Sequence, residues 1–175
     1  KDHWINQLLI CEDFDKTLLS VAIDHGQHDC MEVLLKSGGA DPNVESSKDL
    51  ETPMFDAIEA GDPKAMKILI DHGADLSQRK DNGRSLILDA INLSEYLWKQ
   101  AEFSWFSTFS PNFSGRNECL EVLLQAGIDP NLYSQDLCVT PLTFALYQSR
   151  HDSMEILLKA KADPDYCVDE SPVTP

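Results

Sequence analysis

The chain has 175 residues, of which 42% are hydrophobic and 25% are charged, so it contains enough apolar material for a folded core. Its formal net charge of −16 repels phosphate backbones and anionic membranes, which argues against nucleic-acid or membrane binding and favours a protein partner with a basic face. The five cysteines are odd in number and widely spaced. This pattern predicts free thiols in a reducing cytoplasmic or nuclear compartment.

The amino-terminal segment, residues 1–15, is predicted to be a cap. Trp4, Ile5, Leu8 and Leu9 follow one another at helical spacing, and Thr17 is too close to leave room for a complete repeat. We therefore expect this segment to cover the apolar face that a terminal repeat would otherwise leave in water.

A repeating pattern begins at Thr17. Thr17, Thr52, Ser85, Thr140 and Thr174 are separated by 35, 33, 55 and 34 residues, and each of the first four is followed five residues later by alanine. The hydroxyl side chain can cap the free amides of a first helical turn, and proline is compatible with the next position. A short helix is therefore predicted after each of the first four residues.

A second helix is predicted in each unit, because apolar residues recur on one helical face. The segments concerned are Met31–Leu35, Met66–Ile70, Leu120–Leu124 and Met154–Leu158. Gly39, Gly73 and Gly127 follow three of them and are suited to a left-handed helix end, whereas Lys161 replaces glycine in the fourth, at a cost of up to about 1 kcal/mol. The recurring Asp41, Asp75, Asp129 and Asp163 come next and indicate turns.

This succession of helix, turn, helix and loop resembles the ankyrin repeat, whose signature reads T-P-L-H-x-A, then L-L, then G-A-D-x-N. The resemblance covers residues 16–175 apart from one insertion, and it implies an all-α fold: an ankyrin-repeat solenoid of stacked helix-turn-helix units with projecting β-hairpin loops. The histidine of the signature is replaced in all four units, by Ser20, Phe55, Leu88 and Thr143. The threonine–histidine bonds of the family are therefore expected to be absent or rewired.

The whole chain, 1–175, is expected to be a single ankyrin-repeat domain. The cap is assigned to 1–15, the four repeats to 16–47, 48–80, 81–135 and 136–169, and the start of a further repeat to 170–175. Because Thr174 and Pro175 begin a unit that two residues cannot complete, the chain is interpreted as a segment of a longer protein.

The third repeat contains an insertion at residues 95–115, with seven of the chain's aromatic residues. Two interpretations stay open for them. The aromatic side chains either pack on the neighbouring repeats or anchor a partner protein, in which case Trp105, Phe106 and Phe109 are contact residues.

Catalytic and metal-binding patterns are lacking in the sequence, so no enzyme activity, metal or cofactor is expected. His28 and His151 fall at equivalent repeat positions and are interpreted as scaffold, while His72 is expected to cap a helix end. Cys30 and Cys119 share one repeat position on the apolar face and are expected in the core.

The resemblance implies that a partner protein binds along the concave side, formed by the first helices and the loop tips. Repeat position selects Lys16, Asp24, His25, Asp49, Glu51, Glu59, Arg84, Asn92, Tyr147 and Gln148 in addition to the aromatic residues of the insertion. Tyr147 is the best single candidate, because it is a large aromatic residue where the scaffold needs none.

Two functions agree with this assignment. The first is a protein–protein interaction module, such as the scaffold or recognition part of an adaptor or, by family analogy, of a ubiquitin-ligase substrate receptor. The second is a regulatory ankyrin domain attached to a catalytic or channel domain in the same polypeptide.

Overall fold

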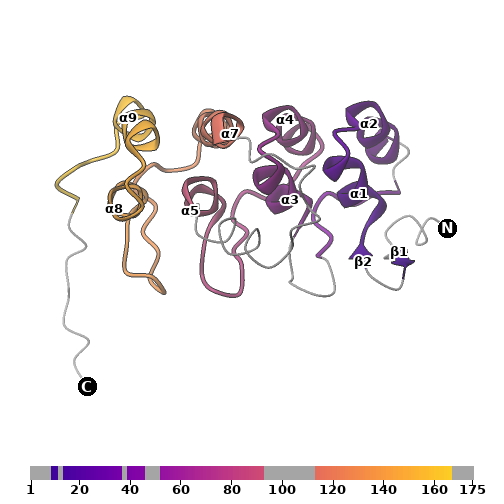
Figure 1. Cartoon of the computed structure of the whole chain (residues 1–175), viewed down its shortest axis with the longest axis horizontal. Helices are drawn as coiled ribbons and strands as arrows, with labels where there is room; N and C mark the ends of the chain where they lie inside the picture. Colours follow the sequence, from indigo (N-terminus) through magenta and orange to yellow (C-terminus); the bar gives the residue numbers. More distant parts are fainter. Residues whose placement is uncertain (1–8, 12–13, 37–38, 46–51, 93–112, 167–175) are drawn as a thin grey trace, which may run out of the picture.

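The computed structural model describes residues 9–11, 14–36, 39–45, 52–92 and 113–166. These residues form four helix pairs in a row, with the first helices in one layer and the second helices in the other (Figure 1). The first helices are α1 (Leu18–Asp24), α3 (Pro53–Ala60), α5 (Leu86–Ile91) and α8 (Pro141–Tyr147). The second helices are α2 (His28–Lys36), α4 (Pro63–Asp71), α7 (Phe113–Gln125) and α9 (His151–Lys159). The predicted all-α solenoid is confirmed.

Two of the four expected helix caps are present. The Thr17 hydroxyl accepts a hydrogen bond from the Ser20 amide at 3.1 Å, and Thr140 forms a reciprocal capping box with Thr143. The prediction is wrong for Thr52 and Ser85, whose side chains make no capping bond. The Thr52 hydroxyl instead donates a hydrogen bond to the Gln78 side chain, which lies in the loop after α4.

The predicted left-handed helix ends are confirmed at three second helices. Gly73 and Gly127 follow α4 and α7 with φ values of 85° and 95°. Lys161 follows α9 with a φ of 68°, so a side chain occupies a backbone conformation that glycine adopts without strain.

Loops project from the layer of first helices (Figure 1). Before the first repeat, β1 (Leu9–Cys11) pairs antiparallel with β2 (Phe14–Lys16), and Arg79 and Ser134 form single bridges to Ser85 and Val139 in later loops. The predicted helical cap is therefore wrong for residues 9–11, because their backbones pair with the strand that leads into α1. The rest of that predicted helix, residues 1–8, lies outside the described residues.

The recurring aspartates make turns, as predicted. Each carboxylate accepts a hydrogen bond from the backbone amide two residues later, at 2.9 Å for both Asp41 and Asp129. Asn43 and Asn131 then connect neighbouring repeats: the Asn43 side chain accepts from the Asp75 amide at 2.7 Å. Asn131 accepts from the Asp163 amide at 2.8 Å in the same way.

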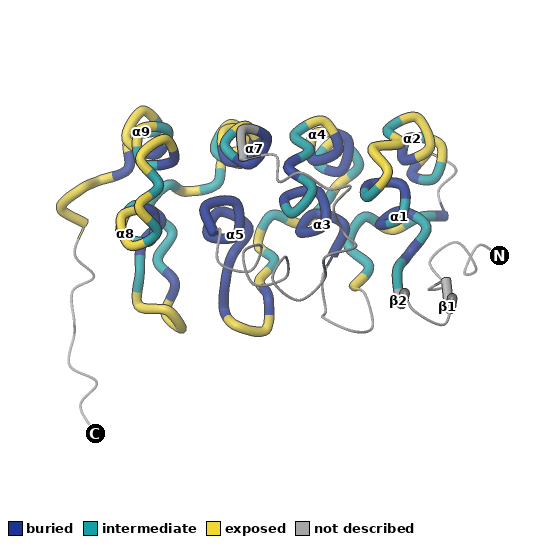
Figure 2. The backbone as a smooth tube through the Cα atoms, in the orientation of Figure 1, coloured by how far each residue is buried: buried dark blue, intermediate teal, exposed yellow. Residues whose placement is uncertain are grey.

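The core lies between the two helix layers and is most complete in the middle of the stack, where α3 and α5 are buried along most of their length (Figure 2). Ala57 and Ala90 are buried at the signature alanine position, where a small side chain lets neighbouring helices approach closely. Cys119 is buried as predicted, but Cys30 is exposed. The expectation for Cys30 is wrong because it lies on the outer face of the first repeat, with no described helix beside it.

The carboxyl end of the predicted insertion is helical. The expected range 95–115 includes Phe113 to Gly115, but these residues form the first turn of α7. As a result α7 has 13 residues, whereas α2, α4 and α9 have 9 each. The remainder of the insertion lies outside the described residues, and the repeat boundaries stay a prediction.

Candidate partner-binding surface

The first helices present one equivalent position in a row, seven residues after each opening threonine or serine. This position holds Asp24, Glu59, Asn92 and Tyr147, which we call the first-helix row. The side chains of Asp24 and Glu59 are each 30% exposed. Tyr147 is 76% exposed, whereas Asn92 is only 3% exposed. The row is therefore accessible at its two ends and closed at α5.

Carboxyl groups gather around one ammonium group at the amino-terminal end of the row. Lys16 Nζ lies 2.6 Å from Asp24 Oδ2, and the charges of Asp56 and Glu59 on α3 also act on Lys16. Burial lowers the pKa of Lys16, but the hydrogen bond and the three carboxyl groups outweigh burial and raise it above its ordinary value. Burial raises the pKa of Asp56 to about 6, although the hydrogen bond from Ser20 opposes this shift.

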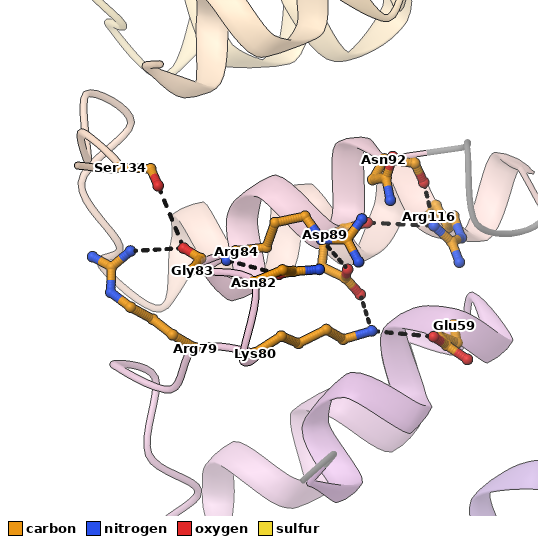
Figure 3. Close-up of polar contacts among 10 residues, drawn as sticks. All are labelled: Glu59, Arg79, Lys80, Asn82, Gly83, Arg84, Asp89, Asn92, Arg116 and Ser134. Carbon is orange, nitrogen blue, oxygen red and sulfur yellow. Dashed lines mark hydrogen bonds and ion pairs between the residues drawn. The ribbon is translucent and has the colours of Figure 1, made fainter. Parts of the chain in front are cut away.

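A buried ion-pair cluster continues from Glu59 toward the third repeat (Figure 3). Lys80 Nζ lies 3.2 Å from Glu59 Oε1 and 3.4 Å from Asp89 Oδ2, so it connects α3 with α5. Arg84 Nε is 3.7 Å from the other Asp89 oxygen. Burial raises the pKa of Asp89 to about 6, against the opposing effect of Lys80 and Arg84. Lys80 also lies 5.1 Å from the centroid of the Phe55 ring, within range of a cation–π contact.

Two predicted contact residues are part of the scaffold. Arg84 is 7% exposed because its side chain turns toward Asp89 (Figure 3), and Asn92 is buried at the end of α5. The expectation that these two side chains face solvent is wrong. The carbonyl oxygen of Asn92 accepts a hydrogen bond from Arg116 Nη1 at 2.5 Å, and that of Asp89 accepts from the same atom at 3.3 Å. Arg116 thus ties the start of α7 to the end of α5, on either side of the insertion.

The remaining predicted residues do not form one site. His25 is exposed and its Nδ1 donates to the Val21 carbonyl at 2.9 Å, which caps α1. Gln148 is half-buried next to Tyr147, at the opposite end of the row of helix pairs from α1 (Figure 1). The other predicted contacts fall outside the described residues: Asp49, Glu51, Trp105, Phe106 and Phe109.

Two of the histidines, His28 and His72, have structural partners. His28 Nε2 lies 2.6 Å from Asp62 Oδ2 across the α2–α4 interface, and His72 Nδ1 donates to the Ile68 carbonyl at 2.9 Å. The prediction of a helix-capping role for His72 is confirmed.

Sequence reasoning missed Asp56, Lys80 and Arg116. One available signal was the pair of aspartates, Asp56 and Asp89, at the same position inside two otherwise apolar first helices. A buried carboxyl group needs a cation or a hydrogen-bond donor nearby. That requirement predicts a lysine or arginine beside the two aspartates, but the sequence alone does not specify which one supplies the charge.

Among the described residues, no group of three or more His, Cys, Asp or Glu side chains is arranged to hold a metal ion. Nor is any helix in this part of the chain long and apolar enough to cross a membrane.

Comparison with known proteins agrees with the repeat geometry. The model of the family described as ankyrin repeats (3 copies) matches residues 2–91, which is about half of the chain. This chain belongs to the ankyrin-repeat family. Ankyrin repeats are protein-interaction modules and are typically non-catalytic. The chain is also similar to human transient receptor potential cation channel subfamily A member 1, with 27% identity over 150 residues. The similarity covers 78% of this chain but 13% of the channel subunit, so the chain spans a small part of that relative's length.

Proposed function

We propose that this ankyrin-repeat chain is a non-catalytic adaptor or scaffold module that binds a basic segment of a partner protein along the first-helix row. The cluster of Asp24, Asp56 and Glu59 around Lys16 is the observation that carries this proposal. At this end of the row the accessible side chains include two carboxylates and one ammonium group. The formal net charge of −16 adds long-range attraction for a positively charged partner.

Tyr147 supplies the second element of this surface. It is 76% exposed at the far end of the same row, and Leu146 beside it is 59% exposed. Exposed aromatic residues are frequent binding hot spots, since they bury a large area with little loss of side-chain entropy. A partner segment that contacts both ends of the row must extend along all four first helices.

Neutralising the acidic end of the row tests the proposal. Partners captured from cells by the wild-type chain are identified by mass spectrometry and then measured as purified proteins against the double variant Asp24→Asn, Glu59→Gln. We expect their affinity to fall at least about tenfold, since charged contacts at an interface are each worth on the order of 1 kcal/mol or more. The matched control is Glu121→Gln, Glu155→Gln, which removes two exposed carboxylates from the second-helix layer. Equal affinities for the two double variants would contradict the proposal.

The aromatic insertion is proposed as an additional anchor, with Trp105, Phe106 and Phe109 as its contacts. Deleting residues 103–112 leaves α7 intact and distinguishes anchoring from packing. If the segment anchors the partner, binding should weaken by several kcal/mol at a nearly unchanged melting temperature, because aromatic hot spots are worth about 2–4 kcal/mol each. A lower melting temperature with unaltered affinity would assign the aromatic side chains to packing.

A regulatory segment within a channel or enzyme polypeptide is the second candidate function. The similarity to a human cation channel subunit favours it. The endogenous protein can be detected in cell fractions with an antibody against this segment. A product of large mass that sediments with membranes supports the channel alternative, whereas a small product in the soluble fraction supports the adaptor.

A further inference from the structure

Two aspartates occupy the same position on neighbouring first helices, and both are buried. Asp56 on α3 is 8% exposed, Asp89 on α5 is 2% exposed, and the two helices pack against each other. Burial is the main cause of the raised pKa of both aspartates, and the negative charge of Glu59 on α3 adds to it in each case. The side chain of Glu59 is 30% exposed. One accessible carboxyl group therefore acts on two buried ones in adjacent repeats.

Asp56 is surrounded by charges from the first two repeats. Burial raises its pKa to about 6, Lys16 opposes this shift, and Asp24 on α1 adds to it. The other helices packed against α3 are α4, α5 and α7. Their ionisable residues are Lys64, Lys67 and Asp71 of α4, Asp89 of α5, and Arg116, Glu118, Cys119 and Glu121 of α7. The charges that act on Asp56 most strongly are those along the first-helix row, namely Lys16, Asp24 and Glu59.

Asp89 has a similar environment one repeat further on. Burial raises its pKa to about 6, Lys80 opposes this shift, and Glu59 adds to it. Arg84 and Arg116 have smaller opposing effects. The helices packed against α5 are α3, α7 and α8, and the ionisable residue of α8 is Tyr147. Both aspartates therefore hold a proton until the pH rises to about 6, and both respond to the charge of Glu59.

A cation bound at Glu59 changes this balance. It cancels the negative charge that favours the protonated aspartates, and it adds a positive charge that favours their ionised form. The pKa of each aspartate is therefore lower in the bound state than in the free chain. Because the bound state holds fewer protons, affinity for the cation is highest above pH 6 and falls as the pH drops through the pKa of the free chain, about 6.

We propose that a basic partner segment bound at Asp24 and Glu59 drives protons from Asp56 and Asp89 into solvent, so that the surface binds near neutral pH and releases its partner in acid. Because the partner must lie at this end of the first-helix row, the coupling rests on the proposed function. Lys80 shows that one ammonium group can serve both kinds of carboxyl group (Figure 3): its Nζ lies 3.2 Å from Glu59 Oε1 and 3.4 Å from Asp89 Oδ2.

The test measures the dissociation constant of a histidine-free peptide of arginine and glycine, whose charge is constant between pH 5 and pH 7.5, at one ionic strength. Affinity should fall about five- to tenfold from pH 7.5 to pH 5 for each aspartate that titrates, since its pKa of about 6 drops to roughly 4–5 on binding. Asp56→Asn, which cannot ionise at this position, should bind more weakly at pH 7.5 and change less with pH. Asp71→Asn removes an exposed carboxylate from α4 and should follow the wild type.

Calorimetry in two buffers with different heats of ionisation counts the protons released on binding. Near pH 6 the wild type should release close to half a proton more than Asp56→Asn. The same pH dependence in the wild type and Asp56→Asn would overturn the coupling, as would peptide binding by the wild type without proton release near pH 6. If the peptide binds the wild type and the double variant Asp24→Asn, Glu59→Gln equally at pH 7.5, the proposed function itself fails, and the coupling fails with it.

Discussion

Among the described residues, three that are not glycine hold left-handed backbone conformations, and these three lie within the predicted fourth repeat. They are Cys138, Ser149 and Lys161, with φ values of 53°, 55° and 68°. Ser149 follows α8 as Gly61 follows α3, and Lys161 follows α9 as Gly73 follows α4. A side chain costs free energy in this conformation, so strain accumulates at one end of the molecule.

Lys161→Gly should increase the free energy of unfolding by about 0.5–1 kcal/mol, since it removes the strain while Lys161 is exposed and has no packing to lose. Urea denaturation measures the change. Lys159→Gly is the control, because Lys159 lies in α9 with helical geometry, and glycine there should cost about 1 kcal/mol. Equal destabilisation by the two substitutions would contradict the assignment of strain to Lys161.

Asp56 makes the stability of the chain depend on pH. Burial raises its pKa to about 6 from an ordinary value of 3.8, so the folded chain holds the proton more tightly than the unfolded chain does. The stability that protonation contributes is complete below about pH 4 and is lost as the pH rises through about 6. Asp56→Asn should flatten this dependence and increase stability at pH 7.5 by on the order of 1–3 kcal/mol. Denaturant titrations of the wild type and of Asp56→Asn at several pH values test this. If the wild type gains stability relative to the variant between pH 5 and pH 7.5, the prediction is wrong.

Residue position within the repeat predicted the conformation of Lys161 but not the burial of Arg84 and Asn92. The left-handed turn depends only on the local order of residues, and the spacing of the repeats gives that order. The direction of a long side chain depends on its neighbours in space. Arg84 turns inward because Asp89 needs a cation, and that need appears only when α3 and α5 are placed side by side.

At the scale of elements, asparagine side chains fasten one loop to the next. Asn43 Oδ1 accepts from the Asp75 amide at 2.7 Å and from Gln78 Nε2 at 2.8 Å. Its own Nδ2 donates to the Gly73 carbonyl at 3.3 Å. The loop after α2 is thereby joined to the loop after α4, in addition to the packing between the helices.

Asn43→Ala should therefore destabilise the chain by about 1–3 kcal/mol, since it leaves several polar groups without partners. Hydrogen exchange measured by mass spectrometry should show faster exchange of the Ala74 and Asp75 amides. In the control Ser77→Ala, the lost hydroxyl bonds only to Asp75 within its own loop, so the loss should be smaller. Indistinguishable stabilities for the two variants would argue against a role in joining the repeats.

The element boundaries that the sequence mispredicted depend on contacts between segments, namely strand pairing and a contact across the insertion. Leu8 and Leu9 fit a helical spacing, but residues 9–11 form a strand because β2 lies beside them. The sequence gives little sign of the first turn of α7, because Ser114 and Gly115 have low helix propensity. The contact of Arg116 with the end of α5 accompanies this turn, and sequence spacing across an insertion does not reveal it.

At the scale of the whole molecule, the stack is unevenly stabilised. In a repeat array each unit contacts only its neighbours, so the end units have one repeat interface and the inner units have two. The helices α3 and α4 contain Met54, Phe55, Met66 and Leu69, all fully buried. In the last pair, the fully buried hydrophobic residues are Ala145 and Leu157, and the strained Ser149 and Lys161 lie at the ends of the two helices.

Amides of α8 and α9 should therefore exchange with deuterium faster than those of α3 and α4, because opening the last pair breaks one interface and releases strain. Lys161→Gly tests the cause: it should slow exchange in α9 and leave exchange in α3 unchanged, since removing strain from the last pair does not alter the stability of the central interfaces. One uniform rate for all four helices would mean that the chain unfolds as a single cooperative unit, and the strain of the last repeat would then be shared by the whole stack.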